Sequence, residues 1–181
     1  MNNNECHAIT TARWLSIFML AFLPWLTACA NQPSSWPFEV QKAGNKVEVE
    51  FKADEHRGYL FDLRLMYKEG DQEDRERVRK LAGRYEKDNN GKLIQPGVPI
   101  LLRFKISVID ASGEKLMLDQ VISELRMTSH GADSFNKRIV EAPLKPGRYR
   151  ISVESLKDVP ELFGTPVIFR IGFYAKSDPI K

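Results

Sequence analysis

The stretch LKPGRYRISVE, residues 144–154, decides the fold. Pro146 and Gly147 predict a tight turn, because proline fixes φ near about −65° and glycine tolerates a positive φ. After this turn Tyr149, Ile151 and Val153 alternate with polar residues. Alternation of period two places the three apolar side chains on one face of a β-strand. The stretch therefore predicts a turn that leads into a strand with one buried face.

The position of Tyr149, just after the turn, is similar to the tyrosine corner of immunoglobulin-like sandwiches. In that arrangement a tyrosine near the start of a strand bonds its hydroxyl to the backbone a few residues upstream. We therefore expect Tyr149 to be structural rather than catalytic.

Period-two alternation recurs along the chain, at residues 47–52, 59–67, 100–108 and 167–173. One apolar face with polar residues opposite is typical of half-buried antiparallel strands. Residues 111–114 predict a turn that pairs the third of these segments with residues 115–122 in a hairpin. The stretch 123–137 shows no clear pattern, and we expect a loop with at most a short strand. The patterns predict an all-β, two-layer antiparallel (immunoglobulin-like) sandwich of seven to nine strands.

A charged insertion, residues 68–97, interrupts the β pattern. It predicts one short helix that is capped by Asp71 or Asp74 and ends at Gly83. Acidic residues come early in the helix and basic residues late, as the helix dipole favours. Its apolar positions form a narrow stripe, Val78, Leu81 and Ala82.

The N-terminal segment is typical of a secretory signal. Residues 14–26 carry no charge and follow Arg13. Thirteen residues are too few to cross a hydrocarbon core, which needs about 20 apolar residues in a helix. They match the 7–15-residue apolar region of a signal peptide.

Residues 26–29, Leu-Thr-Ala-Cys, resemble the bacterial lipobox. The resemblance implies that Cys29 becomes the first mature residue and carries a diacylglycerol and an N-acyl chain. Two or three acyl chains give lasting membrane attachment, because each buried CH₂ contributes about 0.8 kcal/mol. We expect a signal peptide at 1–28, a lipidated tether at 29–37 and a β-sandwich domain at 38–181. Ala30 follows the cysteine, which by analogy with enterobacterial sorting favours the periplasmic side of the outer membrane.

Composition excludes several classes of function. The chain has two cysteines, Cys6 and Cys29, so acylation of Cys29 would leave no thiol after signal removal. The net charge is +3, with acidic and basic residues intermixed, and this argues against nucleic acid as a partner. The sequence contains no metal-binding or phosphate-binding motif, and we expect no cofactor and no metal.

Two kinds of residue are candidates for function. His56 lies beside Asp54 and Glu55, either of which is placed to orient it, and the alternative is a turn histidine bonded to the backbone. The sequence has no Gly-x-Ser-x-Gly motif to supply a nucleophile, so we do not expect an enzyme. The charged insertion is either a solvated face or a recognition element, since arginine binds carboxylates in bidentate fashion. The candidate partner-binding residues are Arg75, Arg77, Arg79 and Arg84 of the insertion, together with His56.

Several segments resemble a family of uncharacterised bacterial lipoproteins that is known as a domain of unknown function. These segments are residues 55–59, 63–64, 67–71, 74–83, 96–100 and 144–150. The resemblance implies an all-β domain behind a lipobox, and some association with secreted-toxin systems. It carries over no catalytic residue.

We therefore expect a lipid-anchored periplasmic module that binds a protein, of the type that gives immunity to a secreted toxin. The alternative is a structural or assembly lipoprotein of an envelope or secretion machine.

Overall fold

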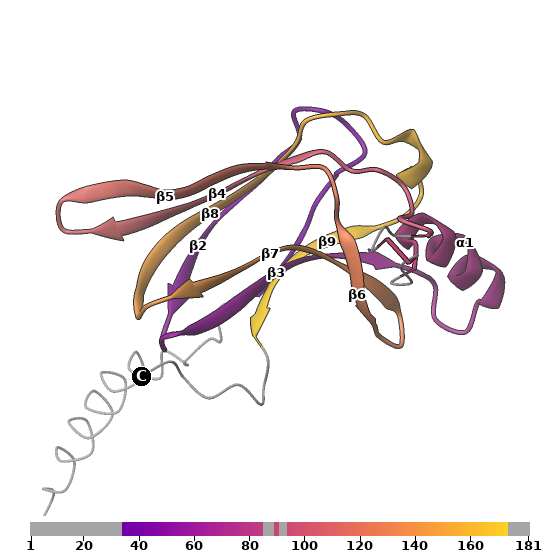
Figure 1. Cartoon of the computed structure of the whole chain (residues 1–181), viewed down its shortest axis with the longest axis horizontal. Helices are drawn as coiled ribbons and strands as arrows, with labels where there is room; N and C mark the ends of the chain where they lie inside the picture. The colour runs from indigo at the N-terminus through magenta and orange to yellow at the C-terminus, as the bar shows by residue number, and fades with distance from the viewer. Residues whose placement is uncertain (1–33, 85–88, 91–93, 174–181) are drawn as a thin grey trace, which may run out of the picture. The chain divides into compact units, whose positions relative to one another are not determined.

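The computed structural model describes residues 34–84, 89–90 and 94–173, which form two antiparallel β-sheets packed face to face (Figure 1). The two-layer all-β sandwich predicted from the alternating segments is confirmed. These residues belong to one compact unit of the chain, residues 33–181.

Sheet A has five strands in the order β1-β9-β3-β7-β6. Their bounds are β1 Ser35–Pro37, β3 Arg57–Met66, β6 Arg126–His130, β7 Ser134–Leu144 and β9 Val167–Phe173. Sheet B has four strands in the order β2-β8-β4-β5. Their bounds are β2 Lys46–Ala53, β4 Leu102–Asp110, β5 Gly113–Ile122 and β8 Gly147–Ser155. The chain also forms helix α1, Gln72–Ala82, and a short 3₁₀ helix η1, Pro160–Leu162.

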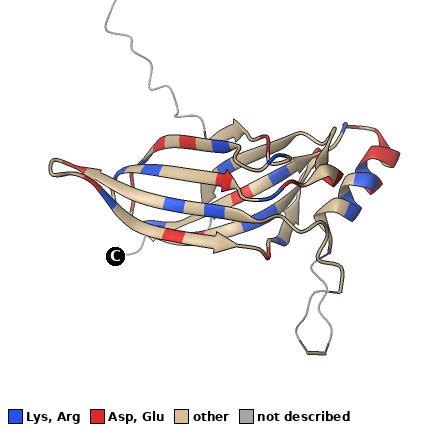
Figure 2. Ribbon diagram, turned by 90° about the horizontal axis from the view of Figure 1, so that it is seen from above, with Lys and Arg blue, Asp and Glu red and all other residues tan. Residues whose placement is uncertain are grey.

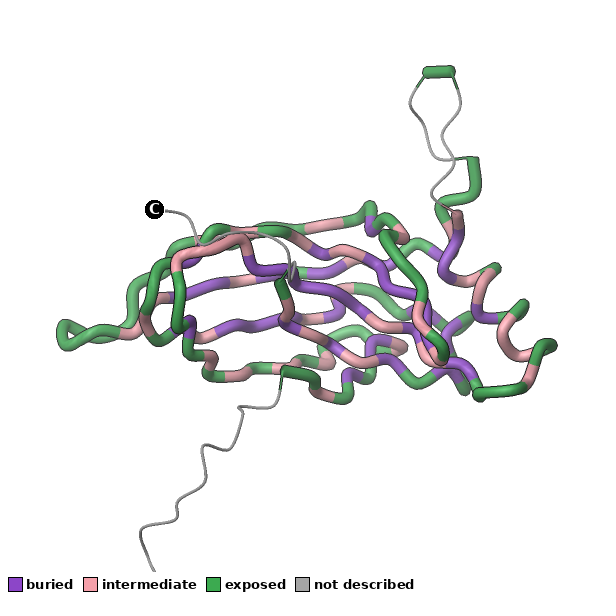
Figure 3. The backbone as a smooth tube through the Cα atoms, turned by 90° about the horizontal axis from the view of Figure 1, so that it is seen from below, coloured by how far each residue is buried: buried purple, intermediate pink, exposed green. Residues whose placement is uncertain are grey.

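The core lies between the sheets, where alternate residues of each strand meet. Figure 3 shows the buried positions alternating with exposed ones along the strands. Phe61 of β3 contacts Phe104 of β4 across the two sheets, with ring centroids 5.0 Å apart. Phe61 also stacks on Phe169 within sheet A. This aromatic contact joins the centres of the two layers.

Tyr149 forms the predicted corner. Its hydroxyl donates to the Lys145 carbonyl at 2.8 Å, and the residue is only 3% exposed. Burial raises the pKa of the Tyr149 hydroxyl, so the proton that it donates stays in place at neutral pH. Tyr59 makes a similar but longer hydrogen bond, in which its hydroxyl donates to the Glu55 carbonyl at 3.2 Å.

We predict that Tyr149→Phe lowers the free energy of unfolding by about 1 kcal/mol, the usual net value of one hydrogen bond. Tyr59→Phe is the matched control, because its bond is longer and we expect a smaller loss. Urea unfolding followed by fluorescence measures both. Equal losses in the two variants would contradict a special role for the Tyr149 corner.

Helix α1 forms as the charged insertion predicts. The Asp71 side chain accepts a hydrogen bond from the Asp74 backbone N–H at 3.0 Å, which caps the N-terminus. Val78 and Ala82 are buried, and Gly83 ends the helix.

The hairpin β6–β7 is the main feature that the alternation did not predict, since residues 123–137 are expected to form a loop with at most a short strand; β6 fits that short strand, but β7 does not. β7 is an eleven-residue strand paired to both β3 and β6. Lys137 occupies a core-facing position there, opposite Leu63. Two residues later the register shifts opposite Phe61 and Asp62, which interrupts the period of two. Because a buried lysine and a bulge both interrupt the apolar alternation, the sequence pattern does not predict this strand.

The folded domain begins earlier than expected. β1 lies inside the range 29–37 that was assigned to the tether, and it pairs with β9. Trp36 stacks on Phe169 with ring centroids 5.9 Å apart. The Ile171 N–H also donates to the Ser34 carbonyl at 2.9 Å. The tether, if Cys29 is acylated, is therefore only about five residues long.

Candidate functional site

Helix α1 lies at one end of the sandwich, beyond the C-terminal end of β3 (Figure 1). Three other segments meet it there. Tyr67 donates to the carbonyls of Gly131 and Ala132 at 3.0 and 2.8 Å, which joins the start of the insertion to the β6–β7 turn. Arg77 donates to the Thr165 hydroxyl at 2.8 Å, which joins α1 to the segment after η1. We call this group of segments the α1 end.

The C-terminus of α1 is held against residues 95–98 by backbone hydrogen bonds. The Val98 N–H donates to the Leu81 carbonyl at 2.8 Å, and the Arg84 N–H donates to the Gln95 carbonyl at 2.6 Å. We call these two segments, with Lys137, the α1 base. The end of α1 and the segment that returns to the sandwich are thus held together by backbone hydrogen bonds.

Two glycines let the segments of the α1 base approach this closely. Gly83 and Gly97 have φ of 84° and 76°, in the left-handed region that favours glycine. A Cβ on Gly97 would lie 2.4 Å from the Leu81 carbonyl oxygen, and a Cβ on Gly83 would lie 2.5 Å from the Gln95 carbonyl oxygen. Neither position has room for a side chain.

We predict that Gly97→Ala lowers the free energy of unfolding by about 2–4 kcal/mol, from left-handed strain plus overlap with the backbone of α1. Gly70→Ala is the matched control. Gly70 has a similar φ of 78°, but a Cβ there meets nothing within 4 Å. We expect about 1 kcal/mol for the control from strain alone, and urea unfolding separates the two. Similar losses would contradict the close contact.

Lys137 completes the α1 base from inside the sandwich. It is 1% exposed, and its Nζ donates to the carbonyls of Ala82 and Pro96 at 2.8 and 3.0 Å. A cation at the C-terminus of a helix is favoured by the helix dipole. Burial lowers the pKa of Lys137 to about 8, so the side chain is still charged at pH 7. One core lysine therefore ties β7 to both halves of the insertion.

We predict that Lys137→Met lowers the free energy of unfolding by about 1–3 kcal/mol at pH 7, because two buried carbonyls lose their donor. The loss should grow as pH rises above 8. The folded chain then releases the Lys137 proton while the unfolded chain, with a pKa of 10.5, keeps it, so wild-type stability gains with pH and the variant does not. Unfolding curves at pH 7 and 9.5 measure the difference in unfolding free energy between the wild type and the variant. A difference that becomes smaller as pH rises would contradict the assigned role of Lys137.

The predicted arginines lie on or next to α1, but they have different partners. Arg77 pairs with Asp74 at 2.7 Å, and Arg79 pairs with Glu76 at 2.6 Å. Arg75 makes no ion pair within the part of the chain that the structure describes. It lines a notch of about 260 Å³ with Tyr67, Asp71 and the β6–β7 turn. Arg84 is half-buried just beyond the helix.

The ion pairs of α1 set its charge pattern. The Lys68 backbone N–H and the Arg77 guanidinium hold the pKa of Asp74 below its usual range. Arg79 lowers the pKa of Glu76 in the same way. Both carboxylates are therefore ionised at neutral pH. Figure 2 shows the acidic residues gathered toward the start of α1 and the basic residues toward its end.

His56 does not join the arginines. It is half-buried in the turn between β2 and β3, whereas α1 follows the opposite end of β3. Ten residues of strand separate these ends, a distance of about 33 Å. Cys29 lies outside the described residues.

The sequence did not predict two further features, the exposure of Phe163 and the burial of Asp62. Phe163, after η1, is 58% exposed at the α1 end. Asp62 is 1% exposed although it was expected on an outer face, and it is covered there by ion pairs with Arg138 and Arg170. Asp62 alternates in sequence like an ordinary exposed residue, so only the cross-strand neighbours from β7 and β9 explain its burial.

Among the described residues, no helix combines the length and the apolar character that crossing a membrane requires. In the same part of the chain, no group of three or more His, Cys, Asp or Glu side chains is placed to hold a metal ion.

A family model for a domain of unknown function, DUF5625, matches residues 35–173. The chain belongs to the DUF5625 family. The matched range begins at β1 and ends at β9, so the DUF5625 domain coincides with the described sandwich. The expectation of an uncharacterised family is confirmed. Curated proteins include no match to the chain.

The DUF5625 fold has a counterpart among solved structures. A crystal structure of a protein from Sulfurospirillum deleyianum is similar to this chain, with a TM-score of 0.65 and 22% sequence identity. The match covers 78% of this chain and 97% of the other. At this identity the likeness shows a shared fold alone.

Proposed function

We propose that the protein is a lipid-anchored, periplasm-facing module of the outer membrane that binds a protein partner through its α1 end. The observation that carries this proposal is the direction in which the chain enters the sandwich. The proposal concerns a binding protein, with no catalytic step and no cofactor.

The register of β1 supports the orientation. β1 is antiparallel to β9, with Ser35 opposite Arg170 and Pro37 opposite Ile168. β9 is antiparallel to β3, so β1 runs in the same direction as β3, toward α1. Ser34, the first described residue, therefore lies at the end of β1 that is nearer the β2–β3 turn. The five residue-to-residue steps from Cys29 to Ser34 span at most about 18 Å.

A short tether on that side keeps the β2–β3 turn near the lipid surface and directs the α1 end away from it. The α1 end also has the composition of a binding surface. It presents exposed Phe163 and the dipolar charge pattern of α1, and it includes Arg75, which makes no ion pair among the described residues. Aromatic residues and arginine are enriched in protein–protein interfaces, and complementary charge gives specificity. The α1 base holds this surface rigid, which limits the entropy lost on binding.

We predict that cells fed labelled palmitate incorporate the label into the wild-type chain and that Cys29→Ser abolishes both the label and membrane fractionation. Two or three acyl chains are needed for stable attachment, so loss of the acceptor should release the protein. An unlabelled wild-type chain in the soluble fraction would overturn the anchoring part of the proposal.

We predict that a photo-crosslinking residue placed at Glu73, on the exposed side of α1, captures a protein partner in intact cells. The same residue at Lys145, in the turn beside β8, is the matched exposed control. Arg75→Glu should weaken capture from position 73 about tenfold through charge reversal. Capture from both positions alike, or capture that Arg75→Glu leaves unchanged, would overturn the α1 end as the contact surface.

The identity of the captured protein separates the two roles expected of such a module. A secreted toxin supports an immunity role, and a component of an envelope or secretion machine supports an assembly role.

A further inference from the structure

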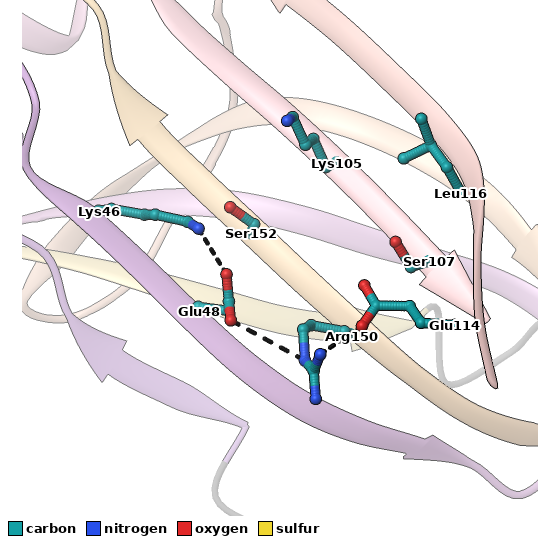
Figure 4. A pocket seen from close by; sticks show the side chains of 8 residues that line it. All are labelled: Lys46, Glu48, Lys105, Ser107, Glu114, Leu116, Arg150 and Ser152. Atoms are coloured by element: carbon teal, nitrogen blue, oxygen red, sulfur yellow. Dashed lines mark hydrogen bonds and ion pairs between the residues drawn. The ribbon is translucent and has the colours of Figure 1, made fainter. Parts of the chain in front are cut away.

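The outer face of sheet B has a hollow of about 290 Å³ (Figure 4). It sits where β8 and β4 run side by side, with β2 and β5 as its walls. The hollow lies over two small residues, Ser107 and Ser152, whereas most neighbouring outward positions of β4 and β8 carry long charged side chains.

Register places these serines in a square with two cations. Ser107 is opposite Arg150, and Lys105 is opposite Ser152. Opposed residues on one face of an antiparallel pair have Cβ atoms about 4.5–5.5 Å apart. The two cations therefore occupy one diagonal of the square and the two hydroxyls the other.

The serine hydroxyls are available to a ligand. Ser107 and Ser152 are 8% and 7% exposed. Within the described residues neither hydroxyl makes a hydrogen bond, although both groups can donate and accept. A buried polar group normally has a partner. The floor of the hollow therefore offers two donors that the protein itself does not use.

Lys105 is also available. Its Nζ lies 3.8 Å from the Asp119 carboxylate, beyond normal hydrogen-bond length, while Arg103 binds the same carboxylate at 2.7 and 2.8 Å. Arg150, in contrast, is engaged with Glu50 and Glu114. Of the two cations in the square, the Lys105 ammonium is therefore the more loosely paired, with one long ion pair to Asp119 among the described residues.

The residues that line the hollow carry one more positive than negative charge, while Asp119 and Glu50, just outside the lining, pair with Lys105 and Arg150. The lining holds Lys46, Lys105 and Arg150 against Glu48 and Glu114. Lys46 pairs with Glu48, and this bond holds the pKa of Glu48 below its usual range, so the carboxylate is ionised at neutral pH. Leu116, 55% exposed, supplies an apolar wall. A ligand with a single negative charge and an apolar group beside it matches this lining.

We propose that the hollow on sheet B binds one carboxylate group that carries an adjacent apolar substituent. The ammonium of Lys105 and the hydroxyls of Ser107 and Ser152 hold the carboxylate, and Leu116 contacts the substituent. This site is independent of the α1 end and of lipidation. The carboxylate belongs either to a small organic acid or to the C-terminus of a peptide.

The test uses the full-length protein in detergent micelles and follows backbone amide signals by NMR. The probe is N-acetyl-leucine, and N-acetyl-leucinamide is the matched control without the charge. We expect saturable shifts at residues 105, 107, 150 and 152 with the acid and none with the amide. A peptide ending in leucine is the second arm. Tighter binding by the peptide identifies a protein C-terminus as the source, and equal binding identifies a small acid.

Lys105→Met should weaken the binding of N-acetyl-leucine at least about fivefold, as expected for loss of a charged donor. Ser152→Ala removes one hydroxyl without changing the charge and should give a smaller loss. Lys145→Met, in the exposed turn before β8, should have no effect. Absent or unsaturable shifts, equal shifts with the amide, or shifts with inorganic phosphate but not with the acid would overturn the proposal.

Discussion

The hydrogen bonds of the Lys137 ammonium decide how the rest of the α1 end is arranged. The side chain leaves β7 inside the sandwich and reaches the last turn of α1 and the segment that returns from the insertion. Gly83 and Gly97 allow those two backbones to touch, and the lysine satisfies the carbonyls that the contact buries. An insertion of charged residues becomes a fixed part of the fold because one cation is placed where a core residue is expected. The candidate contact surface depends on that placement, since α1 has few buried apolar residues of its own.

The fold was predictable wherever burial follows a period of two or 3.6. Strands β2, β3, β4, β8 and β9 and helix α1 all show one apolar face, and Asp71 and Gly83 mark the ends of the helix. The largely exposed β5 was predictable from the turn at residues 111–114. β7 was not predictable, because its core-facing lysine and its bulge break the period, and the loss of β7 also hid β6. β1 was missed because a three-residue strand that ends in a proline and follows a polar stretch looks like a tether, and only its pairing with β9 and the stacking of Trp36 on Phe169 show otherwise.

The candidate sites were less predictable than the fold, for a physical reason. Arginine residues in sequence do not show which carboxylates they pair with, and the structure pairs Arg77 and Arg79 within α1 while Arg75 faces a notch. His56 and the arginines are close in sequence, but a full strand separates them in space. The hollow on sheet B depends on cross-strand neighbours from β8 and β4, which are about 45 residues apart in the chain. Such sites are set by register, which short motifs do not contain.

The short strand β1 also determines how the domain would respond to a mechanical load. A pull on the N-terminus acts along the axis of β1 and therefore across the hydrogen bonds that join β1 to β9. The interstrand bonds then stretch together in shear rather than opening one after another as a zipper does. Trp36, wedged against Phe169, adds resistance to sliding. A protein held at its N-terminus while a bound partner is dragged away would thus transmit force into the centre of sheet A before its first strand detached.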